Sequence, residues 1–439
     1  MARRKQHAPL NVLLNNRPVG QLLKAPSGAI SFTYDRDWLA WEHALPVSLS
    51  MPLRETPYRG EIAASFFDNL LPDSDDLRRR VAEKVGARGT DAYSLLSAIG
   101  RDCVGALQFI ADGDDPVIAT GAFEGEVIDD EAIEKLLLNL AQAPLGLNRD
   151  DDFRISVAGA QEKTALLRHN NTWIKPHGTT PTTHIFKKQI GQLPNGIDLS
   201  NSVENEFYCL KLLEAFGLKV NKAEILNFGN TKALVVERFD RQLTKDGRLI
   251  RLPQEDCCQA LAIPPTLKYQ SQGGPGIVSI LDLLKGSDDP AGDQRAFFAA
   301  QLIFWLIGAT DGHAKNFSIF IGPGGTFQLT PLYDVLTAQA SLDSRQIEPK
   351  QMKLAMSVGD KNHDRMDTIL ARHFLQTASK AGMPDKLARS TIEDVATNAA
   401  QALDKMPGVL PPDFPGAIHE SVSKGVTARL RSLELPKSG

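Results

Sequence analysis

The chain has 439 residues, of which 42% are hydrophobic and 23% charged, with a formal net charge of -4 and a pI near 6.2. This length is enough for two or three domains, and the composition is that of a globular protein. The slight acidity excludes a general electrostatic attraction to nucleic acid or membrane, so such a partner would need a local basic patch.

The N-terminal 110 residues predict an N-terminal subdomain of strands and helices. "NVLLNNRPVGQLL" has two apolar segments around Asn15-Asn16, a β-hairpin signal, and "SGAISFTY" indicates another strand. "AASFFDNLLPDSDDLRRRVAEKVG" is helical, with a break at Pro72 and an end at Gly86. "DAYSLLSAIGRDCVGALQFI" predicts a short helix, a turn and a strand.

The middle of the chain predicts a connecting segment, 111–152, followed by a β-rich lobe, 153–258. The connecting segment is acidic and contains one amphipathic helix, "DEAIEKLLLNLAQA". One helix, "SVENEFYCLKLLEAFG", interrupts the strands of the lobe. The predicted strands are "FRISVAGAQEKTALLR" (two strands around a turn), "NTWIKP", "THIFKKQI", "EILNFG" and "KALVVERFDR".

The last part, 259–439, predicts a helical lobe with one hairpin, "FSIFIGPGGTFQL". Its longest apolar run, 297–308, is shorter than the roughly 20 residues that cross a bilayer, so we expect a buried helix and no membrane contact. The first residues are basic and contain no long apolar stretch, so we expect no signal peptide. The four cysteines form no Cys-x-x-Cys pair, which predicts reduced thiols, no zinc site and a cytoplasmic protein. The predicted fold class is α+β, with a β-rich lobe that precedes an all-α lobe.

The apolar run leads directly into "ATDGHAKNF", 309–317. Asp311 and Asn316 have the separation of the Asp and Asn in the protein-kinase catalytic loop, where the Asp accepts the substrate hydroxyl proton and the Asn binds Mg²⁺. After the hairpin, "LTPLYDV" supplies Asp334 at the position of the metal-binding Asp of kinases. We therefore expect Asn316 and Asp334 to bind Mg²⁺, with His313 and Tyr333 beside the nucleotide.

The β-rich lobe supplies candidates for binding ATP. Lys187 lies on a predicted strand, and burial of its charge is costly unless anions pair with it. Phosphate oxygens and a carboxylate on the next helix would be such partners. Glu206 is the favoured carboxylate and Glu204 the less favoured one. The backbone of "VVERFD", 235–240, can contact adenine. The turn "SVAGAQEK", 156–163, can cover the phosphates with its N–H groups, and we expect little except the nucleotide to hold it closed.

Each of these residues also has a structural explanation. Asp311, Lys187 and Glu206 could be solvated surface residues, and His313 could shape the loop by a hydrogen bond. Their joint order favours a kinase, because chance agreement of the whole series is far less probable than agreement of one member. The alternatives are a small-molecule kinase on the same core, a metal-dependent phosphohydrolase, which would need more paired ligands, and a non-enzymatic co-repressor.

Motifs along nearly the whole chain resemble those of the HipA family, the serine/threonine kinase toxins of bacterial toxin–antitoxin pairs. The motifs are "FFDNLLPDS", "IGRDCVGAL", "DFRISVAGAQEKTALL", "PTTHIFK", "VERFDR", "RLPQEDCCQ", "GGPGI", "WLIGATDGHAKNFS", "LTPLYDV" and "KLAM". The family has an N-terminal subdomain, a kinase-like N-lobe and an all-helical C-lobe, which agrees with the fold class predicted above.

The resemblance implies roles for individual residues. Asp311 is expected to be the general base and Lys187 to hold the phosphates of ATP, so that Asp311, Lys187 and Asn316 are the catalytic set. Ser156 is expected to be an autophosphorylation site. The complete set expected to bind Mg²⁺-ATP is Ser156, Val157, Ala158, Gly159, Ala160, Gln161, Lys187, Glu237, Arg238, Phe239, Asp311, His313, Asn316, Tyr333 and Asp334.

The resemblance also implies partners. These are a small helix-turn-helix antitoxin of the HipB type, operator DNA through that antitoxin, and glutamate–tRNA ligase as the phosphorylated substrate. Phosphorylation of that substrate would stall translation and lead to growth arrest and persistence.

Overall fold

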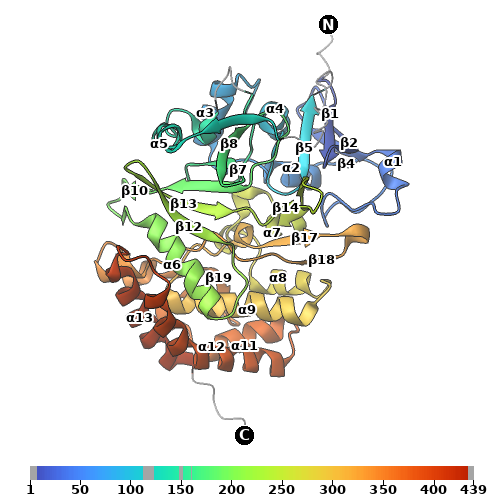
Figure 1. Cartoon of the computed structure of the whole chain (residues 1–439). Coiled ribbons are helices and arrows are strands. Elements are labelled where there is room, and N and C mark those ends of the chain that lie inside the picture. The colour runs from blue at the N-terminus through green and yellow to red at the C-terminus, as the bar shows by residue number, and fades with distance from the viewer. Residues whose placement is uncertain (1–6, 112–122, 148–151, 160, 434–439) are drawn as a thin grey trace. The chain divides into compact units, whose positions relative to one another are not determined.

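The computed structural model describes residues 7–111, 123–147, 152–159 and 161–433. It divides into two compact units (Figure 1). The first unit contains residues 1–188, 226–266 and 319–326, and the second contains 189–225, 267–318 and 327–439. The division into four parts expected from the sequence stays a prediction, and its connecting segment includes residues 112–122 and 148–151, which lie outside the described residues.

The first unit begins with a five-stranded antiparallel sheet of order β4-β3-β2-β1-β5. Its strands are β1 (Leu10–Leu14), β2 (Arg17–Lys24), β3 (Ile30–Tyr34), β4 (Tyr58–Arg59) and β5 (Leu107–Ala111). The helices in this part of the chain are α1 (Arg36–Leu39), α2 (Glu61–Asp68), α3 (Asp75–Val85) and α4 (Ala92–Ile99).

Local sequence signals account for these elements. Asn15 and Asn16 both have positive φ, 48° and 65°, which gives a two-residue turn the twist that a hairpin requires. The hydroxyl of Ser74 accepts a hydrogen bond from the amide of Leu77 and caps the start of α3, and Gly86, with φ 69°, ends that helix. The predicted hairpin and the predicted break at Pro72 are therefore confirmed.

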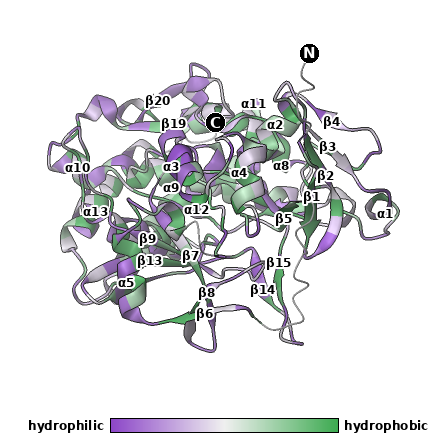
Figure 2. Cartoon of the chain, turned by 90° about the horizontal axis from the view of Figure 1, so that it is seen from above, coloured by the Kyte–Doolittle hydropathy of each residue, from purple (hydrophilic) through white to green (hydrophobic). Residues whose placement is uncertain are grey.

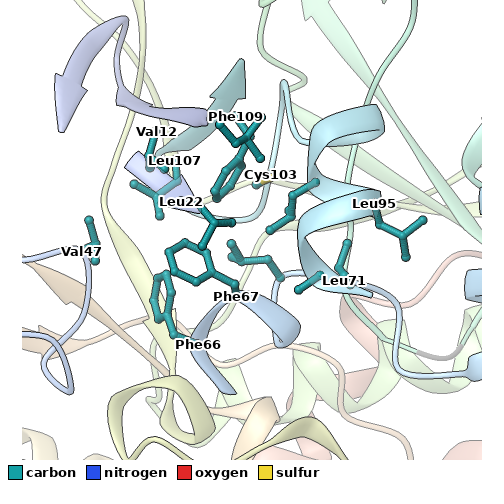
Figure 3. Close-up of a cluster of buried hydrophobic side chains, with 14 of the residues drawn as sticks. Val12, Leu22, Val47, Phe66, Phe67, Leu71, Leu95, Cys103, Leu107 and Phe109 are labelled. Atoms are coloured by element: carbon teal, nitrogen blue, oxygen red, sulfur yellow. The ribbon is translucent and has the colours of Figure 1, made fainter. Parts of the chain in front are cut away.

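The core of this part of the first unit is built from alternate strand residues and from one face of each helix (Figure 3). Val12 and Phe109 on the strands and Phe67 and Leu95 on the helices are all at most 1% exposed. Figure 2 shows the hydrophobic residues along β1, of which Leu10, Val12 and Leu13 are buried.

A six-stranded sheet of order β12-β13-β9-β7-β8-β6 follows. Its strands are β6 (Gly125–Ile128), β7 (Lys163–His169), β8 (Thr172–Pro176), β9 (His184–Lys188), β12 (Ala223–Phe228) and β13 (Thr231–Glu237). Five further elements lie between or after these strands in the sequence: α5 (Asp130–Leu138), β14 (Arg241–Leu243), β15 (Leu249–Arg251), β16 (Gln254–Asp256) and α7 (Cys257–Ala260). Phe186, Val235 and Ile133 belong to a second apolar cluster formed by this sheet and α5.

Two expectations for this region need correction. The sequence predicts a strand on each side of the small-residue turn, but residues 153–158 form no regular strand, and the strand begins only at Lys163. Phe153 and Ile155 are nevertheless buried, so the apolar pattern correctly indicates burial, although the buried segment is irregular and not a strand. The connecting segment also contributes a strand that was not expected, β6, which pairs with β8.

The second unit is mostly helical. Its helices are α6 (Ser202–Ala215), α8 (Ile277–Leu284), α9 (Pro290–Ile307), α10 (Gln339–Asp343), α11 (Ala371–Lys380), α12 (Asp385–Lys405) and α13 (Gly416–Leu430). The short strands in this part of the chain are β10 (Gly191–Gln192), β11 (Asp198–Leu199), β17 (Ser318–Ile321), β18 (Phe327–Leu329), β19 (Lys353–Val358) and β20 (His363–Arg365). Helix α9 packs against α8, α12 and α13, and it is buried on all sides along 297–307.

The hairpin expected after α9 is present, and its turn, which belongs to the first unit, is closed by the Gly322 amide, which donates to the Thr326 carbonyl at 2.8 Å. No other hairpin is expected from the sequence after residue 258, but β19 and β20 form a second antiparallel pair there. Among the helices of the described ranges, none combines the length and apolar character that crossing a membrane requires.

Candidate functional site

The loop that follows α9 carries the first group of candidate residues. Gly308 ends the helix with φ 75°, a left-handed conformation that favours glycine, and the chain turns out of the helix there. Asp311 lies in this loop and is exposed, whereas His313 and Asn316 are 5% and 4% exposed. The buried helix therefore supports a loop that presents one carboxylate to solvent.

The amide of Asn316 holds two parts of this loop region together. Its Nδ2 group donates to the backbone carbonyl of Asp311 and to that of Asp334, both at 3.0 Å. Both acceptors are carbonyls, so the nitrogen must point toward them and the side-chain oxygen Oδ1 away. Within the described ranges Oδ1 makes no hydrogen bond, which leaves an oxygen ligand next to the Asp334 backbone.

Asp334 has φ 58°, in the left-handed region that few residues other than glycine adopt. Such strained positions cluster at functional sites because the surrounding structure has to enforce them. The neighbouring Tyr333 is held by its hydroxyl, which donates to the Lys315 carbonyl at 2.8 Å and lies 2.6 Å from the Ser318 hydroxyl. An amide oxygen and a carboxylate are ligand types that Mg²⁺ takes beside water and phosphate oxygens, so the residue types at 316 and 334 fit such an ion.

The small-residue turn in the first unit is closed by the chain itself. Ser156 is 0% exposed, its hydroxyl donates to the Leu70 carbonyl at 2.7 Å, and its amide donates to the Asp102 carbonyl at 2.9 Å. Gly159 forms a bridge with Pro72. The expectation that little except the nucleotide holds the turn is therefore wrong. Ala160, which was expected to bind ATP, lies outside the described residues.

Lys187 is 6% exposed on β9, so the alternative that it is a solvated strand lysine is excluded. Its register partner on β7 is Lys163, which is also 6% exposed and which sequence reasoning did not select. The ammonium of Lys163 donates to the Ala158 carbonyl at 2.9 Å, beneath the small-residue turn. Two lysines directly across a ladder repel each other, and this arrangement is stabilised when an anion lies beside them.

The segment after β13 was expected to contact adenine through the backbone of Glu237, Arg238 and Phe239. The amide of Arg238 donates to the Thr183 carbonyl at 2.8 Å, so this N–H is occupied. The ring of Phe239 packs edge-on against Phe320 at a centroid distance of 5.6 Å. The side chain of Arg238 is 3% exposed and points into a polar cluster in the protein interior.

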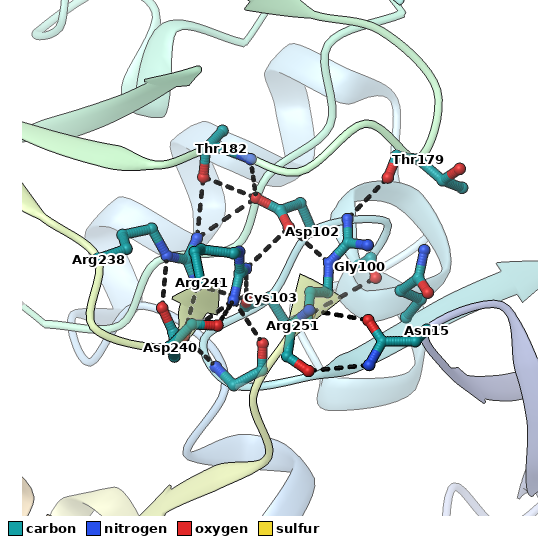
Figure 4. Close-up of polar contacts among 12 residues, drawn as sticks. Asn15, Gly100, Asp102, Cys103, Thr179, Thr182, Arg238, Asp240, Arg241 and Arg251 are labelled. Carbon is teal, nitrogen blue, oxygen red and sulfur yellow. Dashed lines mark hydrogen bonds and ion pairs between the residues drawn. The ribbon is translucent and has the colours of Figure 1, made fainter. Parts of the chain in front are cut away.

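This cluster, which we call the Asp102 cluster, consists of Asp102, Asp240, Arg238, Arg241 and Arg251 (Figure 4). Asp102 accepts from Arg241 at 2.9 Å and from Arg251 at 3.0 Å. Burial alone would raise the pKa of Asp102, but the three guanidiniums outweigh that effect and hold this pKa well below its ordinary value. The cluster joins the segment after β13 to Thr182, which leads into β9.

Glu206 and Glu204 are each 3% exposed on α6, so neither is a solvated helix residue. Gln189 donates to Glu204 at 2.6 Å, which gives the less favoured candidate a partner within the second unit. Lys187 belongs to the first unit and Glu206 to the second, and their pairing stays a prediction. The candidates thus form two groups, one in each unit, and a site that uses both groups is a proposal.

Comparisons with known proteins agree over most of the chain. The HipA N-terminal domain family matches residues 10–110, and the HipA-like C-terminal domain family matches 155–403. The Y4mE protein of Sinorhizobium fredii is 34% identical over 401 residues, 90% of this chain and 91% of that protein. The serine/threonine-protein kinase toxin HipA of Shewanella oneidensis is 28% identical over 417 residues, 92% of this chain and 90% of that protein.

A solved structure extends the similarity to the fold. It is the complex of HipA, HipB and operator DNA from the Shewanella oneidensis toxin–antitoxin system, with a TM-score of 0.80, 26% identity and 96% of each chain covered. This likeness confirms the α+β fold class that the sequence predicts.

Proposed function

Because the chain belongs to the HipA family, we propose that it is a Mg²⁺-ATP-dependent serine/threonine protein kinase and the toxin of a type II toxin–antitoxin pair. One observation carries the proposal. The amide of Asn316 connects the loop of the exposed Asp311 to the backbone of Asp334, which brings the proposed base and the two proposed metal ligands together. This arrangement has the parts that phosphoryl transfer needs.

In the proposed reaction a serine hydroxyl of the substrate protein attacks the γ-phosphorus of ATP, and ADP leaves. Asp311 takes the hydroxyl proton as the new O–P bond forms. Asn316 and Asp334 would hold Mg²⁺, which neutralises charge on the phosphates when it is bound. In the other unit, Lys187 and Lys163 would supply positive charge for the phosphates.

The substrate and partners are part of the same proposal. We propose glutamate–tRNA ligase as the acceptor, a HipB-type helix-turn-helix antitoxin as the binding partner, and co-repression at operator DNA through that antitoxin. The Shewanella oneidensis complex, which contains HipA, HipB and its operator DNA, supports the antitoxin and the operator DNA as partners. Phosphorylation of the ligase would arrest growth.

Self-phosphorylation of Ser156 is the proposed off-switch. The buried hydroxyl of Ser156 has no room for a phosphate of about -1.5 to -2 charge while it donates to Leu70. The phosphorylated turn must therefore leave its closed position, and the N–H groups that would cover ATP leave with it.

The test is incubation with labelled ATP and Mg²⁺, with glutamate–tRNA ligase present and absent. We expect label on serine in the ligase and in the chain itself, with self-labelling lost in Ser156→Ala. Asp311→Asn keeps the size of the side chain but cannot take a proton, so transfer should fall by about 10² to 10⁴ while ATP still binds. Release of free phosphate as the main product would favour a hydrolase, and no labelling of any kind would favour a non-enzymatic co-repressor.

A further inference from the structure

One motif is not explained by kinase chemistry alone. "KYQSQGGPG", 268–276, precedes α8 in the second unit and contains three glycines within four residues. The structure places the hydroxyl of Tyr269 at 2.5 Å from Oδ1 of Asp311, to which it donates a hydrogen bond. The two residues are 42 positions apart in the sequence, so the contact is made by the fold and not by local chain geometry.

We propose that Tyr269 is a positioning residue for the base, which fixes the Asp311 carboxylate by one oxygen and leaves the other for the hydroxyl of the substrate. This inference rests on the proposed kinase function. Within the described ranges, Oδ2 of Asp311 has no hydrogen-bond partner, and Asp311 is exposed. A carboxylate held by a single strong hydrogen bond at one oxygen cannot rotate freely, so the second oxygen keeps one direction.

The position of Tyr269 is itself fixed from several sides. Its ring packs edge-on against His313 at a centroid distance of 4.9 Å and an angle of 82°. Its carbonyl accepts from the amides of Gln272 and Gly274, both at 3.0 Å. The preceding carbonyl, of Lys268, accepts from the Ala314 amide at 3.3 Å, inside the loop of Asp311. The tyrosine is therefore attached to the catalytic loop by its ring, its hydroxyl and its neighbour's backbone.

The glycines explain why this segment can form so tight a turn. Gly273 has φ 94°, which side chains other than hydrogen rarely allow. A Cβ at Gly274 would lie 1.8 Å from the Leu267 carbonyl oxygen and 2.9 Å from that of Tyr269. The short 3-10 helix η3 (Gln270–Gln272) follows Tyr269, and Gln270 accepts from the Ser357 amide at 2.7 Å. The glycine motif thus presents Tyr269 to the base.

The test compares wild type with Tyr269→Phe, which keeps the ring against His313 and removes only the hydroxyl. The assay measures kcat and KM for ATP with purified glutamate–tRNA ligase as acceptor, and self-phosphorylation as a second readout. A hydrogen bond to a charged group is lost, so kcat should fall by about 10- to 100-fold while KM for ATP and the melting temperature stay unchanged. Tyr208→Phe, which removes a phenol hydroxyl bonded to His419 in the same unit, should keep the wild-type rate.

A second variant tests whether the turn acts through the same contact. Gly274→Ala should displace the turn and lower kcat in a similar way, and its effect should largely disappear in the Tyr269→Phe background because both changes remove one contact. Equal kcat in wild type and Tyr269→Phe would overturn the inference, as would a faster variant, since the tyrosine would then obstruct the base. If wild type labels neither acceptor, the proposed function fails first and the inference falls with it.

Discussion

Glu255 shows how a single buried carboxyl can make the stability of the first unit depend on pH. It is 0% exposed, its Oε1 accepts from the Leu49 amide at 2.8 Å, and its Oε2 has no hydrogen-bond partner in the described part of the chain. Burial raises the pKa of Glu255 to about 8. Between its ordinary value of 4.5 and about 8, the folded protein therefore holds a proton that the unfolded chain has released.

The sign of the effect follows from this proton uptake. Stability contributed by neutral Glu255 is fully present below about pH 4.5 and is lost as pH rises toward about 8. We expect the free energy of unfolding to fall by up to about 4 kcal/mol between pH 5 and 8 on account of this group. Glu255→Gln keeps the acceptor for Leu49 and should flatten the slope, as measured by urea unfolding at several pH values. Glu214→Gln, at an exposed glutamate, should leave the slope unchanged.

Individual site residues differ in how far the sequence could reveal them. Asp311 and Asn316 lie on one short loop, so their spacing alone predicted that they share a site. Tyr269 and Lys163 could not be selected in this way, because each reaches its place through contacts between distant segments or neighbouring strands. The burial of the Ser156 hydroxyl against Leu70 joins residues 86 positions apart, and no local pattern reports it.

Among the helices and strands, the features that the sequence predicts correctly are those set by the conformational preferences of neighbouring residues. The Asn15-Asn16 hairpin and the ends of α3 follow from backbone conformations that particular residues favour. Residues 153–158 were misassigned because an apolar alternating pattern indicates burial, and burial here is achieved by an irregular segment. Strand β6 was missed because its partner, β8, is distant in sequence and supplies the pairing.

The Asp102 cluster provides a prediction about how elements are held together. Asp102 is 1% exposed and contacts arginines from the segment after β13 and from β15. Asp102→Asn keeps the shape of the side chain but leaves the cluster with three buried guanidiniums and one carboxylate, Asp240. We expect a loss of about 3–5 kcal/mol in the free energy of unfolding, measured by denaturant titration.

A nearby ion pair supplies the matched control for this substitution. Asp152 contacts Arg101 at 3.1 Å, and its side chain is 63% exposed. Asp152→Asn makes the same chemical change where water screens the charge, so it should cost no more than about 1 kcal/mol. Equal losses in the two variants would mean that burial of the Asp102 cluster does not set its contribution.

For the whole molecule, the proposed function predicts that production of this chain alone arrests the growth of the bacterium that makes it. In the proposed function, Asp311, Asn316 and Asp334 are the base and the metal ligands, and the hydrogen bonds that connect them are made within this chain. Arrest should therefore begin on induction of the toxin alone and be relieved by a co-produced HipB-type protein. The measurement is colony formation and growth rate after induction, with protein levels compared on blots.

Asp311→Asn tests whether growth arrest depends on phosphoryl transfer. The substitution changes one exposed side chain, whose Oδ1 can still accept from the Tyr269 hydroxyl, and it leaves the contact of Asn316 with the backbone carbonyl of residue 311 in place. The variant should accumulate to the same level, still bind the antitoxin and allow normal growth. Arrest by Asp311→Asn at equal expression would show that toxicity does not depend on phosphoryl transfer. Normal growth with wild type would count against the toxin assignment while leaving the kinase reaction to be judged by the labelled-ATP assay.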